Sequence, residues 1–155
     1  MRVKREMRSL AKSFRNAFRG VRSVAKHERN FRIHMCMTFY VLVFSIIGEV
    51  SKADILRFIL CFGIVMAAEL LNTSIELLCD AVSGRFDERI REIKDIAAGA
   101  VLVTAISAAA VGLITFLSPD GFGRVISRLI SMPYVTVLGI ISLPFAVRFV
   151  MGRRK

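Results

Sequence analysis

A row of polar side chains interrupts one of the most apolar stretches of the chain. Its members follow one another at spacings of three, four and four residues: Glu69, Asn72, Glu76 and Asp80. On an α-helix these spacings place all four side chains within about 80° of one another, on a single face. Ionisable groups in a membrane-spanning helix are costly, so they usually face a bundle interior or a cavity and mark function. The row therefore predicts a polar site inside a membrane protein.

The position of the row along its helix predicts that this site lies near one membrane surface. If the helix begins at Ile55, Glu69 lies about 21 Å and Glu76 about 31 Å along it. Glu76 is then expected at the cytoplasmic interface, with Glu69 two turns deeper in the membrane. Other polar residues in neighbouring segments are expected close to the cytoplasmic interface as well: Glu28, His34, Lys94 and Asp95.

Carboxylates, an amide and a lysine at one level suit the binding of a metal ion and a phosphate chain. Mg²⁺ prefers oxygen ligands and usually takes one or two carboxylates together with substrate phosphates. A partly desolvated carboxylate could accept a proton from an alcohol, and a cation could offset charge on a transferring phosphoryl group. The alternative is a buried polar network that fixes helix register or oligomeric state. The common glycine-rich nucleotide motifs are absent, and His27 and His34 are interpreted as interfacial side chains rather than ligands.

The elements that must position these residues are those of a membrane protein. Hydrophobic residues make up 55% of the 155 residues and the mean hydropathy is +0.58, which is too apolar for a soluble domain of this size. Four apolar runs are predicted to form spans: residues 33–50, 55–82, 96–117 and 133–151. Ser51 or Asp54 is expected to cap the second of these helices. The predicted fold is all-α and integral to the membrane, with three core spans and a fourth, C-terminal one interrupted by Pro144 and Arg148.

Basic residues are concentrated at the N-terminus. Eleven of the 23 Lys and Arg residues lie within residues 1–32, where apolar residues recur at three- and four-residue spacing. This pattern is typical of an amphipathic helix in the lipid headgroup region. The loop after the second run and the C-terminus are also basic, so the N-terminus, this loop and the C-terminus are expected in the cytoplasm. The net charge of +11 would also suit nucleic-acid binding, but its uneven distribution argues against nucleic acid as a partner.

The polar row also resembles the signature of a known family. The stretch from Glu69 to Asp80 closely resembles E-x-x-N-[ST]-[SA]-I-E-x-x-x-D of the small prokaryotic diacylglycerol kinases. Residues 18–34 and 94–102 are similar to the family in order and spacing, so the resemblance covers residues 13–117. Both segments are more similar to the Gram-positive branch, the undecaprenol kinases, than to the Gram-negative diacylglycerol kinases.

The resemblance implies a lipid kinase of the cytoplasmic (inner) membrane that works as a homotrimer, with sites between neighbouring subunits. It implies transfer of the γ-phosphoryl group of MgATP to the hydroxyl of a lipid alcohol, with undecaprenol favoured and diacylglycerol as the alternative acceptor. By matching position, Glu69 would be the general base, and Glu28 and Glu76 would hold Mg²⁺ with the ATP phosphates. The remaining matched residues would complete the site around the phosphates and the acceptor: Asn72, Lys94 and Asp95.

The chain departs from the family pattern after the third span, where the family core usually ends. We therefore divide it into a surface helix at 1–32, a three-span kinase core at 33–117 and an extension at 118–155. The extension is expected to contain a short interfacial helix at 124–131 before the fourth span. Two other classes stay open: a non-enzymatic membrane protein with a structural polar core, and a small channel or transporter. The row lies toward one interface rather than at the midplane favoured by transporters, which argues against the latter.

Overall fold

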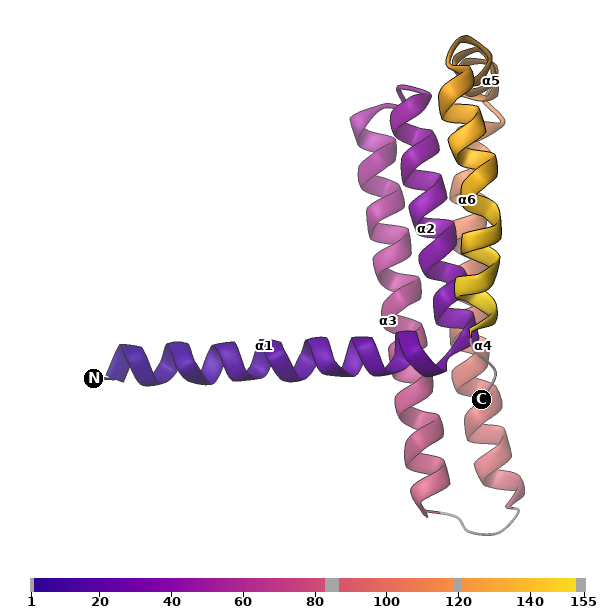
Figure 1. Ribbon diagram of the computed structural model, residues 1–155. Helices are drawn as coiled ribbons and strands as arrows, with labels where there is room; N and C mark the ends of the chain where they lie inside the picture. The colour runs from indigo at the N-terminus through magenta and orange to yellow at the C-terminus, as the bar shows by residue number, and fades with distance from the viewer. Residues whose placement is uncertain (1, 83–86, 119–120, 153–155) are drawn as a thin grey trace.

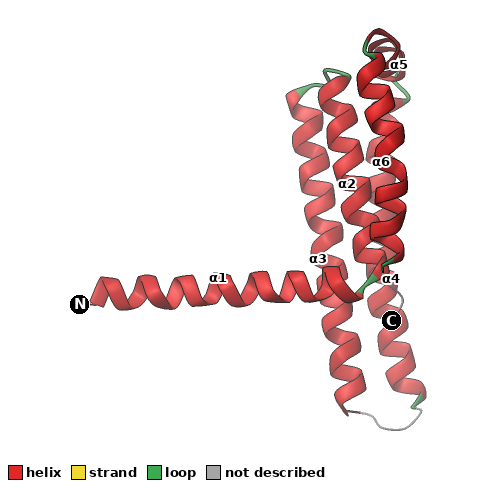
Figure 2. Ribbon diagram, viewed as in Figure 1, coloured by secondary structure: helices red, strands yellow, loops and turns green. Residues whose placement is uncertain are grey.

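The computed structural model describes residues 2–82, 87–118 and 121–152, whose regular structure is entirely helical (Figures 1 and 2). The helices in chain order are α1 (Arg2–His27), α2 (Arg29–Ile47), α3 (Lys52–Val82), α4 (Glu88–Phe116), α5 (Gly121–Ser131) and α6 (Pro133–Met151). Helices α2, α3, α4 and α6 form an upright bundle, α1 leaves its side at a steep angle, and α5 lies at the end of the bundle opposite the C-terminal end of α3 (Figure 1). The predicted all-α fold is confirmed.

Three helices of the described ranges are long and apolar enough to cross a membrane, namely α2, α4 and α6. Helix α6 is the predicted fourth span, and it remains helical through Pro144 and Arg148. Helix α3 is not among the three, although it is 31 residues long and packs against both α2 and α4. All four predicted runs therefore form helices, but only three of these helices are apolar enough to be identified as spans. The fourth, α3, is the helix that carries the polar row.

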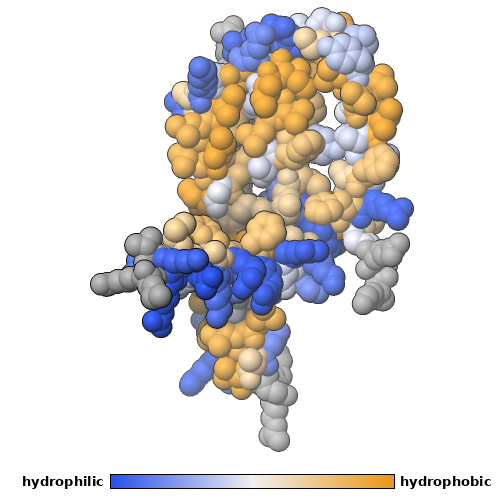
Figure 3. Space-filling model, turned by 60° about the vertical axis from the view of Figure 1, so that its left-hand side comes forward, coloured by the Kyte–Doolittle hydropathy of each residue, from blue (hydrophilic) through white to orange (hydrophobic). Residues whose placement is uncertain are grey.

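Helix α1 has the arrangement expected of a membrane-surface helix. Its large apolar side chains, among them Leu10, Phe14 and Phe18, are exposed instead of packing on the bundle. Figure 3 shows a hydrophilic band at the level where α1 meets the bundle, next to the apolar belt formed by the bundle itself. The helix ends at His27, earlier than the predicted boundary at residue 32, because Glu28 has an extended backbone that turns the chain into α2.

Helices α3 and α4 form the most extensive helix pair. Near the turn between α2 and α3, Phe58 is 1% exposed and stacks on Phe116, with ring centroids 5.6 Å apart. At the start of α3, the Ser51 hydroxyl accepts a hydrogen bond from the Asp54 backbone N–H at 3.1 Å, which confirms the predicted cap. The Ser51 hydroxyl and the Arg57 guanidinium hold the pKa of the Asp54 carboxyl below its usual value. At their other ends α3 and α4 extend past the level of α1 (Figure 1).

Helix α5 packs on the turn that follows α2. A helix is present where the short helix at 124–131 was predicted, and it begins earlier, at Gly121. Val125 of α5 is buried, and a Cβ placed on Gly48 would lie 2.6 Å from its Cγ2 and 3.1 Å from the carbonyl oxygen of Phe44. Arg128 of α5 forms an ion pair with Glu49 in the same turn. Only glycine at position 48 allows this close approach.

Replacing Gly48 with alanine is therefore expected to lower the melting temperature of the protein in detergent micelles. The added methyl group overlaps Val125, and overpacking of this kind costs about 1–3 kcal/mol. Gly123→Ala is a matched control on α5, because nothing lies within 4 Å of a Cβ placed there. Equal melting temperatures for the two variants would show that α5 is not held against this turn.

Candidate functional site

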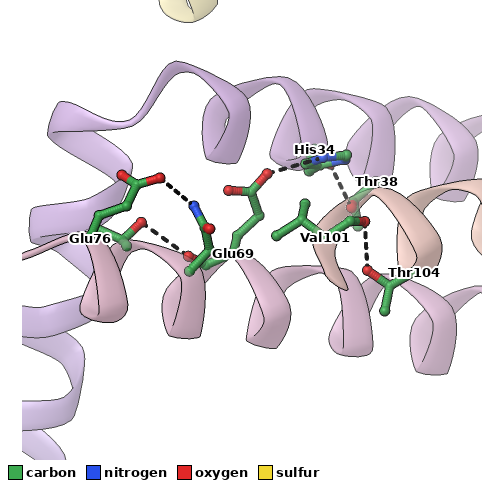
Figure 4. Close-up of polar contacts among 8 residues, drawn as sticks. His34, Thr38, Glu69, Glu76, Val101 and Thr104 are labelled. Carbon is green, nitrogen blue, oxygen red and sulfur yellow. Dashed lines mark hydrogen bonds and ion pairs between the residues drawn. The ribbon is translucent and has the colours of Figure 1, made fainter. Parts of the chain in front are cut away.

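Among the described residues, Glu69 is the carboxylate that is buried, with only 3% of its surface exposed. It projects from α3 toward α2, where its Oε1 lies 3.3 Å from Nε2 of His34 (Figure 4). This contact is within ion-pair distance but lacks hydrogen-bond geometry, so Oε1 has no hydrogen-bond partner among the described residues. Leaving a buried carboxylate oxygen without a partner is costly. Such an orphaned oxygen is typical of a group that meets a ligand or a substrate.

The hydroxyl groups around Glu69 bond to the backbone of their own helices. Thr73 donates to the carbonyl oxygen of Glu69 at 3.0 Å, and Thr38 donates to that of His34 at 2.8 Å (Figure 4). Thr104 does the same within α4. These three hydroxyl groups are therefore already engaged and do not donate to the Glu69 carboxylate, which can accept a proton from elsewhere.

Asn72 and Glu76 form a second polar pair one to two turns further along α3. The Asn72 side-chain Nδ2 donates to Oε1 of Glu76 at 2.8 Å (Figure 4). The Oδ1 atom of Asn72 is buried and has no hydrogen-bond partner in the described part of the chain. The row thus presents two orphaned oxygens, one on Glu69 and one on Asn72, at neighbouring positions of one helix face.

The elbow between α1 and α2 brings Glu28 to the level of Glu76. His34 follows Glu28 by six residues, so the His34–Glu69 contact lies about 9 Å deeper in the bundle than the elbow. Helix α3 runs antiparallel to α2, and Glu76 follows Glu69 by seven residues. Glu76 therefore lies about 10 Å closer to the elbow than Glu69, at the level of the elbow itself. The charges of Glu28 and Glu76 both act on Glu69. The Glu28 side chain makes no capping hydrogen bond, although the residue occupies the N-cap of α2.

Lys94 and Asp95 lie at the margin of this arrangement. Lys94 forms an ion pair with Asp80, which joins the start of α4 to the end of α3, and the charge of Glu76 also acts on Lys94. Asp95 is exposed on α4, and no hydrogen bond or ion pair within the described ranges connects it to the polar row. The single chain thus gathers Glu28, Glu69, Asn72 and Glu76, and it leaves the two α4 residues outside that group.

The described residues do not form a complete metal site by themselves. Among the described residues, no three or more His, Cys, Asp or Glu side chains are grouped so that they could hold a metal ion. Glu28 and Glu76 nevertheless share a level, and the orphaned Asn72 oxygen is nearby in sequence. Mg²⁺ needs only one or two protein carboxylates when phosphate oxygens supply further ligands. The oxygen-only donor set fits Mg²⁺ bound together with a phosphate chain.

Sequence reasoning did not pair His34 with Glu69. The sequence predicts an interfacial side chain at His34, whereas the structure places it half-buried against the Glu69 carboxylate. The available signal is that His34 approaches the same membrane surface as the polar row. That signal alone does not show which face of α2 packs on α3, so the contact depends on helix packing.

Comparison with known proteins identifies a family and two relatives that are named lipid kinases. The prokaryotic diacylglycerol kinase family matches residues 15–116. The undecaprenol kinase of Bacillus subtilis is 36% identical over 112 residues, which cover 72% of this chain and 91% of that protein. A diacylglycerol kinase of Synechocystis sp. is 37% identical over 112 residues, which cover 72% of this chain and 64% of that protein. No solved structure gives a significant match. The polar row lies inside the family match, and α5 and α6 lie outside it.

Proposed function

We propose that this chain, which belongs to the prokaryotic diacylglycerol kinase family, transfers the γ-phosphoryl group of ATP to the hydroxyl of a membrane lipid alcohol. The observation that carries the proposal is the buried Glu69 carboxylate, whose Oε1 has no hydrogen-bond partner among the described residues. It lies on the membrane side of the α1–α2 elbow, where the headgroup of a lipid alcohol could reach it from the bilayer. The Asn72–Glu76 pair lies closer to the elbow, on the side from which a cytosolic nucleotide would approach.

The acceptor we propose is undecaprenol. The relative named an undecaprenol kinase is matched over 91% of its length, whereas the relative named a diacylglycerol kinase is matched over 64%. The two identities are nearly equal, at 36% and 37%, so diacylglycerol is the second candidate. Both acceptors present a hydroxyl at the membrane surface, so the same residues would serve either reaction.

The proposed roles follow the depth of each side chain. Glu69, the deepest, accepts the proton of the attacking lipid hydroxyl as a general base. Glu28 and Glu76, at the level of the elbow, hold Mg²⁺ together with the nucleotide phosphates. The other three residues bind around the phosphates and the acceptor: Asn72, Lys94 and Asp95. When bound, Mg²⁺ would neutralise charge on the phosphates during transfer.

The same proposal sets the orientation and the assembly of the protein. Helix α1 lies on the cytoplasmic face of the cytoplasmic membrane, since the most basic segment is retained on that side. Asp95 is exposed on α4, and no hydrogen bond or ion pair among the described residues connects it to the row, which suits a site completed between subunits. A homotrimer with sites between neighbouring chains would provide this arrangement.

The test is phosphoryl transfer from labelled ATP by the purified protein in mixed micelles, with undecaprenol and diacylglycerol offered separately. The Glu69→Gln variant serves as the blank. Faster turnover of undecaprenol supports the proposed acceptor, and faster turnover of diacylglycerol replaces it with the second candidate. If a folded protein phosphorylates neither lipid, the kinase proposal is wrong and a structural role for the polar row takes its place.

A further inference from the structure

A buried arginine holds three segments together at the elbow between α1 and α2. Arg32 is only 8% exposed. Its Nη1 donates to the carbonyl oxygens of Ala25 and Lys26 at the end of α1, at 3.3 and 2.8 Å. Its Nε donates to the carbonyl oxygen of Val150 at the end of α6, at 3.2 Å. One side chain therefore joins the surface helix to the C-terminal helix.

The chemistry of helix ends explains why a guanidinium occupies this position. The last carbonyl groups of a helix have no partner within the helix and carry partial negative charge. Arginine has five N–H donors in a fixed plane, so one side chain can serve two helix ends at once. Because the group is buried, losing either end would leave part of its charge and hydrogen-bonding capacity unsatisfied.

Helix α6 depends on few contacts for its position. It has no buried residue, and an open groove of about 340 Å³ is lined by residues of both α6 and α2. Midway along the helix, Tyr40 and Ser142 form a hydrogen bond at 2.8 Å. At its end, Gly152 has a φ of +64°, and a Cβ placed there would lie 3.1 Å from Nη2 of Arg32. The Arg32 contact therefore fixes the cytoplasmic end of α6.

We propose that α6 clamps the elbow through Arg32 and thereby positions Glu28 for MgATP, an inference that rests on the proposed function of Glu28. The backbone N–H of Arg32 donates to the carbonyl oxygen of Glu28 at 3.4 Å, so both residues belong to the first turn of α2. Arg32 is a positioning residue for Glu28, because its side chain donates to the ends of α1 and α6 and is not proposed to touch the nucleotide. The family match stops at residue 116, so α6 adds this clamp from outside the matched region.

The clamp can be loosened from the α6 side without changing Arg32. Gly152→Ala places a methyl group against the guanidinium at a φ that alanine rarely adopts. Gly139→Ala is the matched control on the same helix, because nothing lies within 4 Å of a Cβ there. Arg32→Lys is a second variant that keeps the charge, but its single ammonium group cannot span both helix ends.

Two measurements on the full chain decide the proposal. Hydrogen exchange at residues 25–32 reports the elbow directly, and steady-state kinetics report its effect on MgATP. Gly152→Ala and Arg32→Lys should speed exchange there and raise the KM for MgATP about three- to tenfold with little change in kcat, as expected for losing a charge-assisted hydrogen bond. Gly139→Ala should match the wild type in both.

Each outcome has a definite meaning. Unchanged exchange in both variants overturns the clamp, and faster exchange with an unchanged KM overturns the positioning of Glu28. A fall in kcat with no rise in KM would also overturn it, because it would place Arg32 in the chemical step. If the wild type phosphorylates no lipid, the proposed function fails, and the exchange comparison still decides whether the clamp exists.

Discussion

Replacing Glu69 with glutamine is expected to lower kcat by about 100- to 10,000-fold, the range typical of removing a general base. Glutamine has nearly the same size and shape, so it fits the buried position that Glu69 occupies at 3% exposure. The Thr73 hydroxyl bonds to the backbone carbonyl of residue 69, which the substitution does not alter. The amide cannot accept a proton from the lipid hydroxyl, and it also lacks the negative charge that faces His34.

The decisive comparison is between turnover and nucleotide binding in the same preparation. Glu69→Gln should bind MgATP nearly as well as the wild type, since Glu76 and Asn72 remain in place to meet the nucleotide. Glu88→Gln is the matched control, because Glu88 is exposed and pairs only with Arg91 on its own helix among the described contacts. A loss of MgATP binding as large as the loss of turnover would contradict the assignment of Glu69 as the base.

The candidate site was predictable because its strongest signal is periodic. Glu69, Asn72 and Glu76 recur at helical spacing within an apolar run, and local helix geometry alone places them on one face. Burial of Glu69 and the Asn72–Glu76 hydrogen bond agree with that prediction. The order of depth, with Glu69 deeper than Glu76, also follows from helical rise and needs no knowledge of how the helices pack.

The features that were not predicted depend on which helix faces meet. The contact of His34 with Glu69 requires one particular face of α2 to pack on α3. The pairing of Lys94 with Asp80 requires the start of α4 to lie against the end of α3. Arg32 bonds a residue 118 positions away along the chain, which no local pattern indicates. Packing of this kind is set by the three-dimensional fit of side chains, so composition and spacing do not reveal it.

Replacing Glu76 with glutamine should instead weaken MgATP binding by about 10- to 100-fold. Even the loss of a residue that only hydrogen-bonds a metal ligand weakens metal binding by about this much. Glutamine keeps an oxygen that can accept the hydrogen bond from Asn72 Nδ2, now at 2.8 Å. The hydrogen-bonded pair therefore survives, and the change removes only the negative charge. Since Mg²⁺ favours charged oxygen ligands, both the KM for MgATP and the Mg²⁺ concentration needed for half-maximal rate should rise.

The two glutamate variants are most informative when they are measured together. If depth assigns the roles, Glu69→Gln lowers kcat with little effect on the KM for MgATP, and Glu76→Gln raises that KM with a smaller effect on kcat. An Mg²⁺ dependence of Glu76→Gln equal to that of the Glu88→Gln control would exclude Glu76 as a metal ligand. The reverse pattern, with kcat lost at position 76 and metal dependence changed at position 69, would exchange the two roles. In that case the proton acceptor would lie at the level of the elbow, and the lipid hydroxyl would have to rise to that level to react.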